Sequence, residues 1–180
     1  PNHNNTIDMV LSVSGIPVVA LELKNQLTGQ DYHCAIKQYK NDRSSKEFCF
    51  RIDHRFLVYF AVDLYEVWMT MQLKDGNTYF MPFNQGSNGA GIDGHAGNPI
   101  YDGYATHYLW EEVLQRDSLM DILHRFVSHV REKDENTGKI KEKLLFPRYH
   151  QYDVVRKVLT DVKQNGAGKN YLIQHSAGSG

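Results

Sequence analysis

Three charged residues interrupt two strand-like segments near the start of the chain. Asp8 follows Ile7, and Glu22 and Lys24 lie at the end of an otherwise apolar run. Alternate residues of a strand point to the same face, so Glu22 and Lys24 project together. A turn over residues 14–17 would fold Asp8 back beside them. The sequence therefore predicts that two carboxylates and one ammonium group converge.

This grouping has a specific chemical use. Paired carboxylates hold a hard cation such as Mg²⁺, and a nearby lysine can orient water or stabilise charge on a phosphate. The alternative is a salt-bridged edge strand with a solvated face, because charges on strand faces are common and surface ion pairs contribute little to stability. Spacing alone leaves both interpretations open.

A mixed α/β domain is expected around these residues. Apolar runs and turn residues predict strands over 6–13, 17–24 and Phe56–Val62, a helix from the cap Asp31 to about Arg43, and a hairpin of 66–73 with 78–83 through Asp75-Gly76. The glycine-rich stretch 84–106 is expected to be a long loop. Tyr101, Tyr104 and Tyr108 either stack on nucleic acid or pin the loop to its own domain.

The second half of the chain is expected to contain helices and one further strand. Helical spacing predicts helices over 108–114 and 118–130, the latter capped by Asp117 or Ser118, then an exposed turn or linker over 131–143, a helix from Phe146 to about Gln164 and a buried strand over Asn170–Gln174.

Longer segments strengthen the metal interpretation. Ile7-Asp8 followed by Glu22-Leu23-Lys24 resembles the metal-dependent nuclease core of an Asp, a gap and Glu-x-Lys. The wider chain resembles the motor-and-nuclease subunit of type I restriction enzymes, in segments 22–30, 38–43, 56–62, 108–114, 146–151 and 175–180. The resemblance implies an N-terminally truncated nuclease domain over 1–131 with a restriction-endonuclease-like mixed β-sheet flanked by helices. A linker over 132–145 and the start of a RecA-like motor domain over 146–180 would follow.

The resemblance also assigns roles at the nuclease site. Asp8 and Glu22 become ligands of Mg²⁺, with the backbone carbonyl of Leu23 as a third oxygen, and Lys24 holds the attacking water or the scissile phosphate. The implied reaction is hydrolysis of phosphodiester bonds in double-stranded DNA. Related nucleases often carry Gln-x-x-x-Tyr on the next helix, but here Asp42 stands four residues after Gln38. Gln38, Lys40 and Arg43 therefore remain DNA-binding candidates.

A second set of residues resembles the nucleotide site of superfamily 2 motors. Phe146, Arg148 and Gln151 correspond to the adenine-reading element, since a glutamine amide can match both a donor and an acceptor of adenine. Gly178 and Gly180 correspond to the phosphate-binding loop. The chain stops before the lysine and hydroxyl that this loop needs. ATP with Mg²⁺ is thus expected to bind only the full-length protein.

Composition limits the protein class without identifying a partner. A net charge of −1 does not indicate a nucleic-acid protein, and two cysteines are too few for a disulfide scaffold. No apolar run is long enough for a membrane span, so a cytoplasmic protein is expected. The resemblance implies methyltransferase and specificity subunits as partners. A non-catalytic DNA-binding module and a subunit-docking module remain alternatives.

Overall fold

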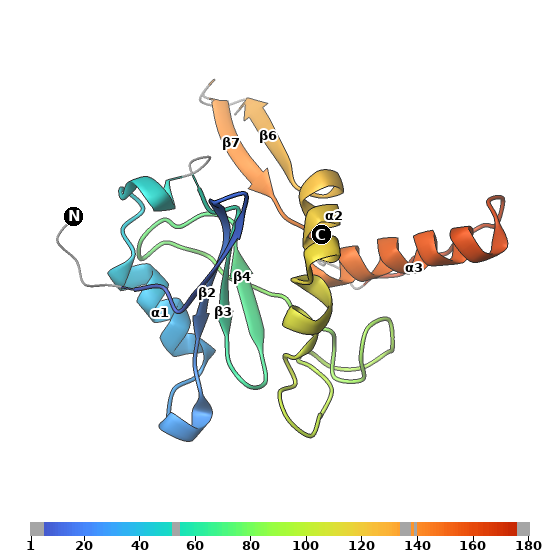
Figure 1. Ribbon diagram of the computed structural model, residues 1–180, viewed down its shortest axis with the longest axis horizontal. Helices are drawn as coiled ribbons and strands as arrows, with labels where there is room; N and C mark the ends of the chain where they lie inside the picture. Colours follow the sequence, from blue (N-terminus) through green and yellow to red (C-terminus); the bar gives the residue numbers. More distant parts are fainter. Residues whose placement is uncertain (1–5, 52–54, 134–137, 139, 176–180) are drawn as a thin grey trace.

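A mixed sheet with helices on both faces forms the body of the molecule, and a separate two-stranded ribbon projects from it (Figure 1). The computed structural model describes residues 6–51, 55–133, 138 and 140–175. Its strands are β1 (Met9–Val13), β2 (Ile16–Leu23), β3 (Val58–Val62), β4 (Val67–Thr70), β5 (Met81–Pro82), β6 (Ser128–Lys133) and β7 (Ile140–Leu145). Its helices are α1 (Tyr32–Asp42), α2 (Arg116–Arg125) and α3 (Tyr149–Asn165), with the 3-10 turns η1 (Gln26–Thr28) and η2 (Phe48–Phe50) and a π-helical turn η3 (Leu109–Val113).

The sheet confirms the predicted α/β class with mixed strand directions. Among the described residues its order is β1-β2-β3-β4-β5, with β2 and β3 parallel and the other neighbours antiparallel. The β1–β2 turn is tight because Ser14 and Gly15 both have positive φ, of 50° and 82°. Such a turn matches the twist of the strands it joins. The parallel pair requires a crossover, which α1 supplies.

Helix α1 covers one face of the sheet. Asp31 caps it as predicted, because its Oδ1 accepts hydrogen bonds from the backbone N–H groups of His33 (3.0 Å) and Cys34 (3.2 Å). The buried side chains Ala35 and Tyr39 pack on this face, and Arg43 follows the helix as its C-cap. The apolar cluster beneath α1 contains Ala20, Ala35, Tyr39, Phe50, Phe56, Tyr59, Ala61, Leu73 and Phe80.

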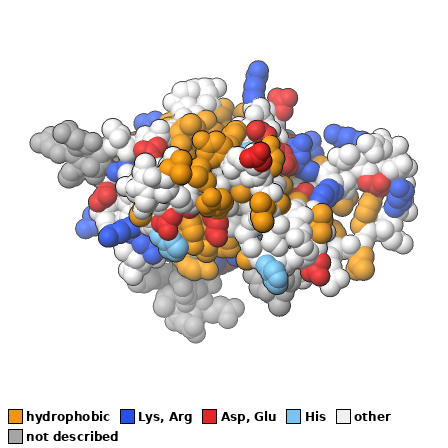
Figure 2. Space-filling model, turned by 90° about the horizontal axis from the view of Figure 1, so that it is seen from below, with side chains coloured by type: hydrophobic (Ala, Val, Ile, Leu, Met, Phe, Trp, Pro, Cys, Tyr) orange, Lys and Arg blue, Asp and Glu red, His pale blue; other side chains and the backbone are white. Residues whose placement is uncertain are grey.

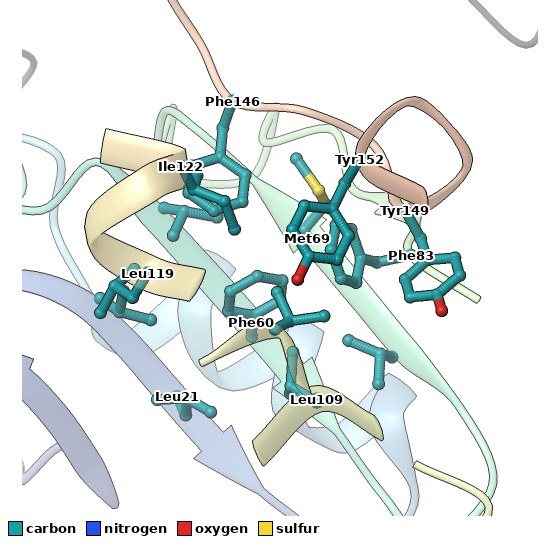
Figure 3. Packing of buried hydrophobic residues seen from close by; sticks show 14 of the residues in the cluster. Leu21, Phe60, Met69, Phe83, Leu109, Leu119, Ile122, Phe146, Tyr149 and Tyr152 are labelled. Atoms are coloured by element: carbon teal, nitrogen blue, oxygen red, sulfur yellow. The ribbon is translucent and has the colours of Figure 1, made fainter. Parts of the chain in front are cut away.

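The opposite face is covered by η3, α2 and the first turns of α3 (Figure 3). Phe60 lies at its centre, in edge contacts with Phe83 and Phe146 at centroid distances of 5.3 and 6.1 Å. The sheet contributes Val19, Leu21, Phe60, Val62 and Met69, and the covering elements contribute Leu109, Val113, Leu119, Ile122, Phe146, Tyr149 and Tyr152. Residues 146–152 therefore share a core with the sheet.

Two predicted elements around the sheet need correction. The hairpin of 66–73 with 78–83 is much shorter than expected: only Trp68 and Met69 of β4 pair with β5. Residues after Thr70 leave the ladder, and Leu73 and Phe80 turn into the α1 cluster instead. The helix predicted over 118–130 ends at Arg125, and Gln115, rather than Asp117 or Ser118, is the N-cap of α2.

The segment expected to be an exposed turn or linker forms the ribbon β6–β7. Arg131 lies directly opposite Glu142, with Nε and Oε1 2.9 Å apart, and Lys143 binds Glu132 at 2.6 Å. Opposite charges across neighbouring strands favour pairing. The charged residues that suggested a solvated linker therefore pair across a ribbon.

The loop over 84–106 has no regular helix or strand, as predicted, but it is tied to the sheet. The Asn84 side chain accepts a hydrogen bond from Val67 N at 2.9 Å, and Asn98 donates to Tyr65 O at 2.8 Å. Tyr101 stacks on His107 with a centroid distance of 4.2 Å. These contacts hold the loop on its own domain.

The strand predicted over Asn170–Gln174 is absent. This segment has no regular structure, and Leu172 and Ile173 are exposed. A strand needs a neighbouring strand to pair its backbone groups, and among the described residues no strand pairs with this segment. The prediction of a buried strand here was wrong.

Candidate functional site

The β1–β2 hairpin brings the predicted acidic residues together. Met9 pairs with Leu21, which places Asp8 beside the end of β2, and Asp8 Oδ2 accepts a hydrogen bond from Leu23 N at 2.8 Å. Lys24 Nζ lies 4.0 Å from the same Asp8 oxygen. The expected convergence of Asp8, Glu22 and Lys24 is thus present in the structure, while their catalytic roles stay predictions.

Glu22 is a fully buried acid on the α1 face of the sheet. Its side chain is 0% exposed, and β3 presents Ala61 opposite it. Its Oε1 accepts hydrogen bonds from Arg43 Nη2 at 2.6 Å and from Arg43 Nε at 3.2 Å. Its Oε2 is buried and has no hydrogen-bond partner. Oε1 is therefore paired with the positive charge of Arg43, whereas Oε2 is a hydrogen-bond acceptor without a donor.

The electrostatics of Glu22 reflect this burial. Burial and, to a smaller extent, the nearby Asp8 carboxylate raise the pKa of Glu22 to about 7, against the opposing effect of the Arg43 guanidinium. A buried carboxylate is costly to ionise unless positive charge lies close to it. A cation at Oε2 would supply that charge.

Lys24 is held between a carboxylate and an amide. Its Nζ donates to Gln38 Oε1 at 2.7 Å, and its side chain is mostly buried. An ammonium group has three donor hydrogens. Gln38 therefore fixes the direction of Lys24 while leaving donor capacity for a further acceptor.

The oxygens present fit a magnesium ion. Mg²⁺ in proteins is commonly bound by one or two carboxylates and retains several waters. Asp8 and Glu22 supply two carboxylates, and Oε2 of Glu22 is a buried acceptor without a hydrogen-bond partner. Within the described ranges, no cluster of three or more His, Cys, Asp or Glu side chains could hold a metal. A third protein oxygen would have to come from the backbone, as the Leu23 prediction requires.

The three DNA-binding candidates occupy different environments. Gln38 binds Lys24, and Lys40 is half-buried in the last turn of α1. Arg43 is only 3% exposed and points inward to Glu22. Figure 2 shows a band of hydrophobic side chains through the middle of one face, with Lys and Arg mainly to the left and right of this band. DNA contacts by these residues stay predictions.

The pairing of Arg43 with Glu22 was missed from the sequence, although a signal existed. Ala35, Tyr39 and Arg43 are spaced by four residues, and residues at this spacing share one face of a helix. Ala35 and Tyr39 are fully buried. The same spacing directs Arg43 toward the sheet rather than toward solvent.

The nucleotide-binding candidates fall partly in the core. Phe146 is buried against Phe60, and the Gln151 side chain accepts a hydrogen bond from Arg148 N at 3.0 Å at the start of α3. Arg148 Nη2 lies 3.3 Å from Met81 Sδ. Gly178 and Gly180 lie outside the described residues. ATP binding by this set stays a prediction.

The comparisons with known proteins concern the sheet and α1. Residues 1–82 match the family described as type I restriction enzyme R protein N terminus. This range ends at β5, so it contains Asp8, Glu22, Lys24 and all five strands of the sheet. No curated protein and no solved structure matches the chain. No helix in the described part of the chain is long and apolar enough to cross a membrane. Residues 1–82 are thus similar to the N-terminal region of type I restriction enzyme R proteins, a match that covers less than half of the chain.

Proposed function

We propose that the chain is the nuclease part of a type I restriction enzyme R subunit, which hydrolyses phosphodiester bonds in double-stranded DNA with Mg²⁺. The observation that carries this proposal is the meeting of Asp8, Glu22 and Lys24 at the end of β2, with Glu22 Oε2 buried and unpartnered. A restriction-endonuclease-like sheet is part of the same proposal.

Each residue has a separate task in this reaction. Asp8 and Glu22 would hold Mg²⁺, together with the Leu23 carbonyl. When bound, the ion polarises a phosphoryl oxygen and favours formation of hydroxide. Lys24, oriented by Gln38 at 2.7 Å, donates to the attacking water or to the scissile phosphate. The protein contributes mainly position and fixed charge.

The remaining partners follow from the family. We propose that methyltransferase and specificity subunits join the R subunit, and that an ATPase motor follows the nuclease. Residues 146–180 would begin that RecA-like motor, with Phe146, Arg148, Gln151, Gly178 and Gly180 toward ATP. The packing of Phe146 in the core means that any adenine contact by this residue would require it to leave Phe60.

Calorimetry with Mn²⁺ tests the proposal directly. Native chain, Asp8→Asn and Glu22→Gln are titrated, with Asp102→Asn and Glu111→Gln as matched controls at exposed positions. The proposal of one metal site is supported if the native chain and both controls bind Mn²⁺ saturably and if Asp8→Asn and Glu22→Gln do not bind it. Equal binding by all five proteins contradicts it.

A second measurement separates cleavage from simple DNA binding. Linear double-stranded DNA is incubated with Mn²⁺ and with native chain or Lys24→Met, and DNA affinity is measured in EDTA. Metal-dependent cutting by the native chain alone supports nuclease chemistry. DNA binding in EDTA without metal binding would favour a non-catalytic DNA-binding module, and absence of both would favour a docking module.

A further inference from the structure

We propose that Arg43 is a positioning residue of the candidate metal site, which orients Glu22 and the segment carrying Asp8, and that it does not contact DNA. This inference rests on the proposed function for its metal and extends it to a residue outside the Asp, Glu and Lys set.

The guanidinium of Arg43 is directed entirely inward. It is 3% exposed, and its Nε and Nη2 both bind Glu22 Oε1. Nη2 also donates to the backbone carbonyl of Thr6, and Nη1 lies 3.5 Å from Asp42 O. Contact with a DNA phosphate would require Arg43 to abandon these acceptors and leave Glu22 as an unpaired buried carboxylate, which is costly.

These bonds join the three segments that build the site. Arg43 follows α1, Glu22 lies on β2, and Thr6 precedes Asp8 by two residues. On the other side of this connection, Asp8 accepts from Leu23 N. Arg43 and Asp8 therefore fasten the segment over residues 6–8 to β2 from two points, which fixes the two carboxylates relative to each other.

Arg43 binds only one of the two carboxylate oxygens of Glu22. Both Arg43 donors that reach Glu22 fall on Oε1, and Oε2 is left buried without a partner. A residue whose only task was to neutralise Glu22 could bind both oxygens in the bidentate manner that suits guanidinium and carboxylate. The observed arrangement holds the carboxylate by one oxygen and leaves the other for a cation.

Positioning and charge neutralisation predict opposite effects on metal affinity. Removing a positive charge beside two carboxylates should strengthen the binding of a divalent cation if charge alone matters. Removing a group that orients metal ligands typically weakens metal binding about 10- to 100-fold. Arg43→Met is expected to weaken Mn²⁺ binding by this factor, and Arg43→Lys to recover part of it.

The experiment measures Mn²⁺ affinity by calorimetry and DNA affinity in EDTA for native chain, Arg43→Met, Arg43→Lys and Lys37→Met. Lys37 is the matched control, since it is an exposed cation on α1, the helix that Arg43 follows as C-cap. Weaker Mn²⁺ binding in Arg43→Met, with DNA affinity in EDTA and the Lys37→Met affinity for Mn²⁺ unchanged, supports the inference. Stronger or unchanged Mn²⁺ binding overturns it, as does a loss of DNA affinity in EDTA. If Arg43→Met does not fold, Arg43→Lys decides by the same criteria.

Amide hydrogen exchange tests the positioning independently of any metal. Leu23 N donates to Asp8, whereas the adjacent Lys24 N donates to Val62 O across the sheet. Arg43→Lys should accelerate exchange at Leu23 and leave Lys24 nearly unchanged. Equal exchange rates at Leu23 in native chain and Arg43→Lys overturn the inference, whether or not the native chain binds Mn²⁺. Absence of Mn²⁺ binding by the native chain would by itself reject only the proposed function.

Discussion

Consecutive residues of β2 face two different environments. Leu21 points to the side covered by η3, α2 and α3, where the neighbours are apolar, whereas Glu22 points to the α1 side, where it meets Arg43 and Asp8. Both residues are buried. The alternation of the strand thus separates two faces. We call the side covered by η3, α2 and α3 the packing face, and the α1 side the polar face, because its apolar cluster adjoins the buried charges of Glu22 and Arg43.

The two faces depend on different forces. On the packing face, stability scales with the apolar area and volume removed from water, so each truncation has a graded cost. On the polar face, the partners depend on one another, because removing one leaves a buried group unsatisfied. Substitutions on the packing face should therefore change mainly the free energy of unfolding, and substitutions at Glu22 and its partners should change metal affinity.

The largest expected effect belongs to the packing face. Phe60→Ala removes the ring that lies between Phe83 and Phe146, and should lower the free energy of unfolding by about 3 to 5 kcal/mol. Mn²⁺ affinity of the folded fraction should be unchanged. Urea denaturation with and without Mn²⁺ measures both quantities. A loss of metal affinity as large as that of Glu22→Gln would mean that the two faces are not independent.

The next effect is the pH dependence of the polar face. Because burial raises the Glu22 pKa from 4.5 to about 7, the folded state binds this proton more tightly than the unfolded state. By proton linkage, the stabilisation that protonated Glu22 provides is fully present below pH 4.5 and is lost as pH rises through about 7. The predicted loss is about 3 kcal/mol.

Urea denaturation across this range, in EDTA, checks the pH effect against Glu22→Gln. The difference between the two proteins matters, because other carboxylates also titrate: Asp31, Asp75 and Asp161 have pKa values lowered by hydrogen bonds and act at lower pH. Glu22→Gln should lack the decline between pH 4.5 and 7. Parallel curves for both proteins would show that Glu22 does not titrate in this way.

The smallest effect concerns the helix that covers the polar face. Asp31→Ala removes the cap that accepts from His33 N and Cys34 N, and should cost about 1 kcal/mol. Asp31→Asn retains an acceptor oxygen and should cost less. Thermal unfolding of both variants measures the difference. An equal loss in both would assign the effect to the charge of Asp31 rather than to capping.

The parts of the molecule that sequence predicted well are those set by neighbours along the chain. The strand alternation of β2, the tight turn at Ser14-Gly15 and the Asp31 cap are local features, and together they brought Asp8 beside Glu22 and Lys24. The buried strand β3 was predicted because a short run of five apolar residues, rich in β-branched and aromatic side chains, is typical of a strand buried on both faces.

The features that sequence missed depend on partners far along the chain. Arg43 binds a residue 21 positions away. Its spacing from Ala35 and Tyr39 indicates the inward face of α1, but spacing along a helix does not name the partner on β2. The ribbon β6–β7 is specified by charges that complement one another only once the strands are in register. The core position of Phe146 was missed because Phe60, which its ring contacts, lies 86 residues earlier in the chain. The residues next to Phe146 in the sequence indicated only a nucleotide motif.

The two edges of the sheet differ in their openness to an added strand. At one edge, β5 has two residues, and one of them, Pro82, has no N–H to donate. At the other edge, β1 has five residues with exposed Met9 and Val10, and within the described part of the chain it pairs only with β2. Long apolar edges promote self-association, while short ones with proline resist it. Within the five-stranded sheet, pairing with an added strand is therefore disfavoured at β5 and open at β1, so the solubility of this domain depends strongly on a strand that contributes little to its core.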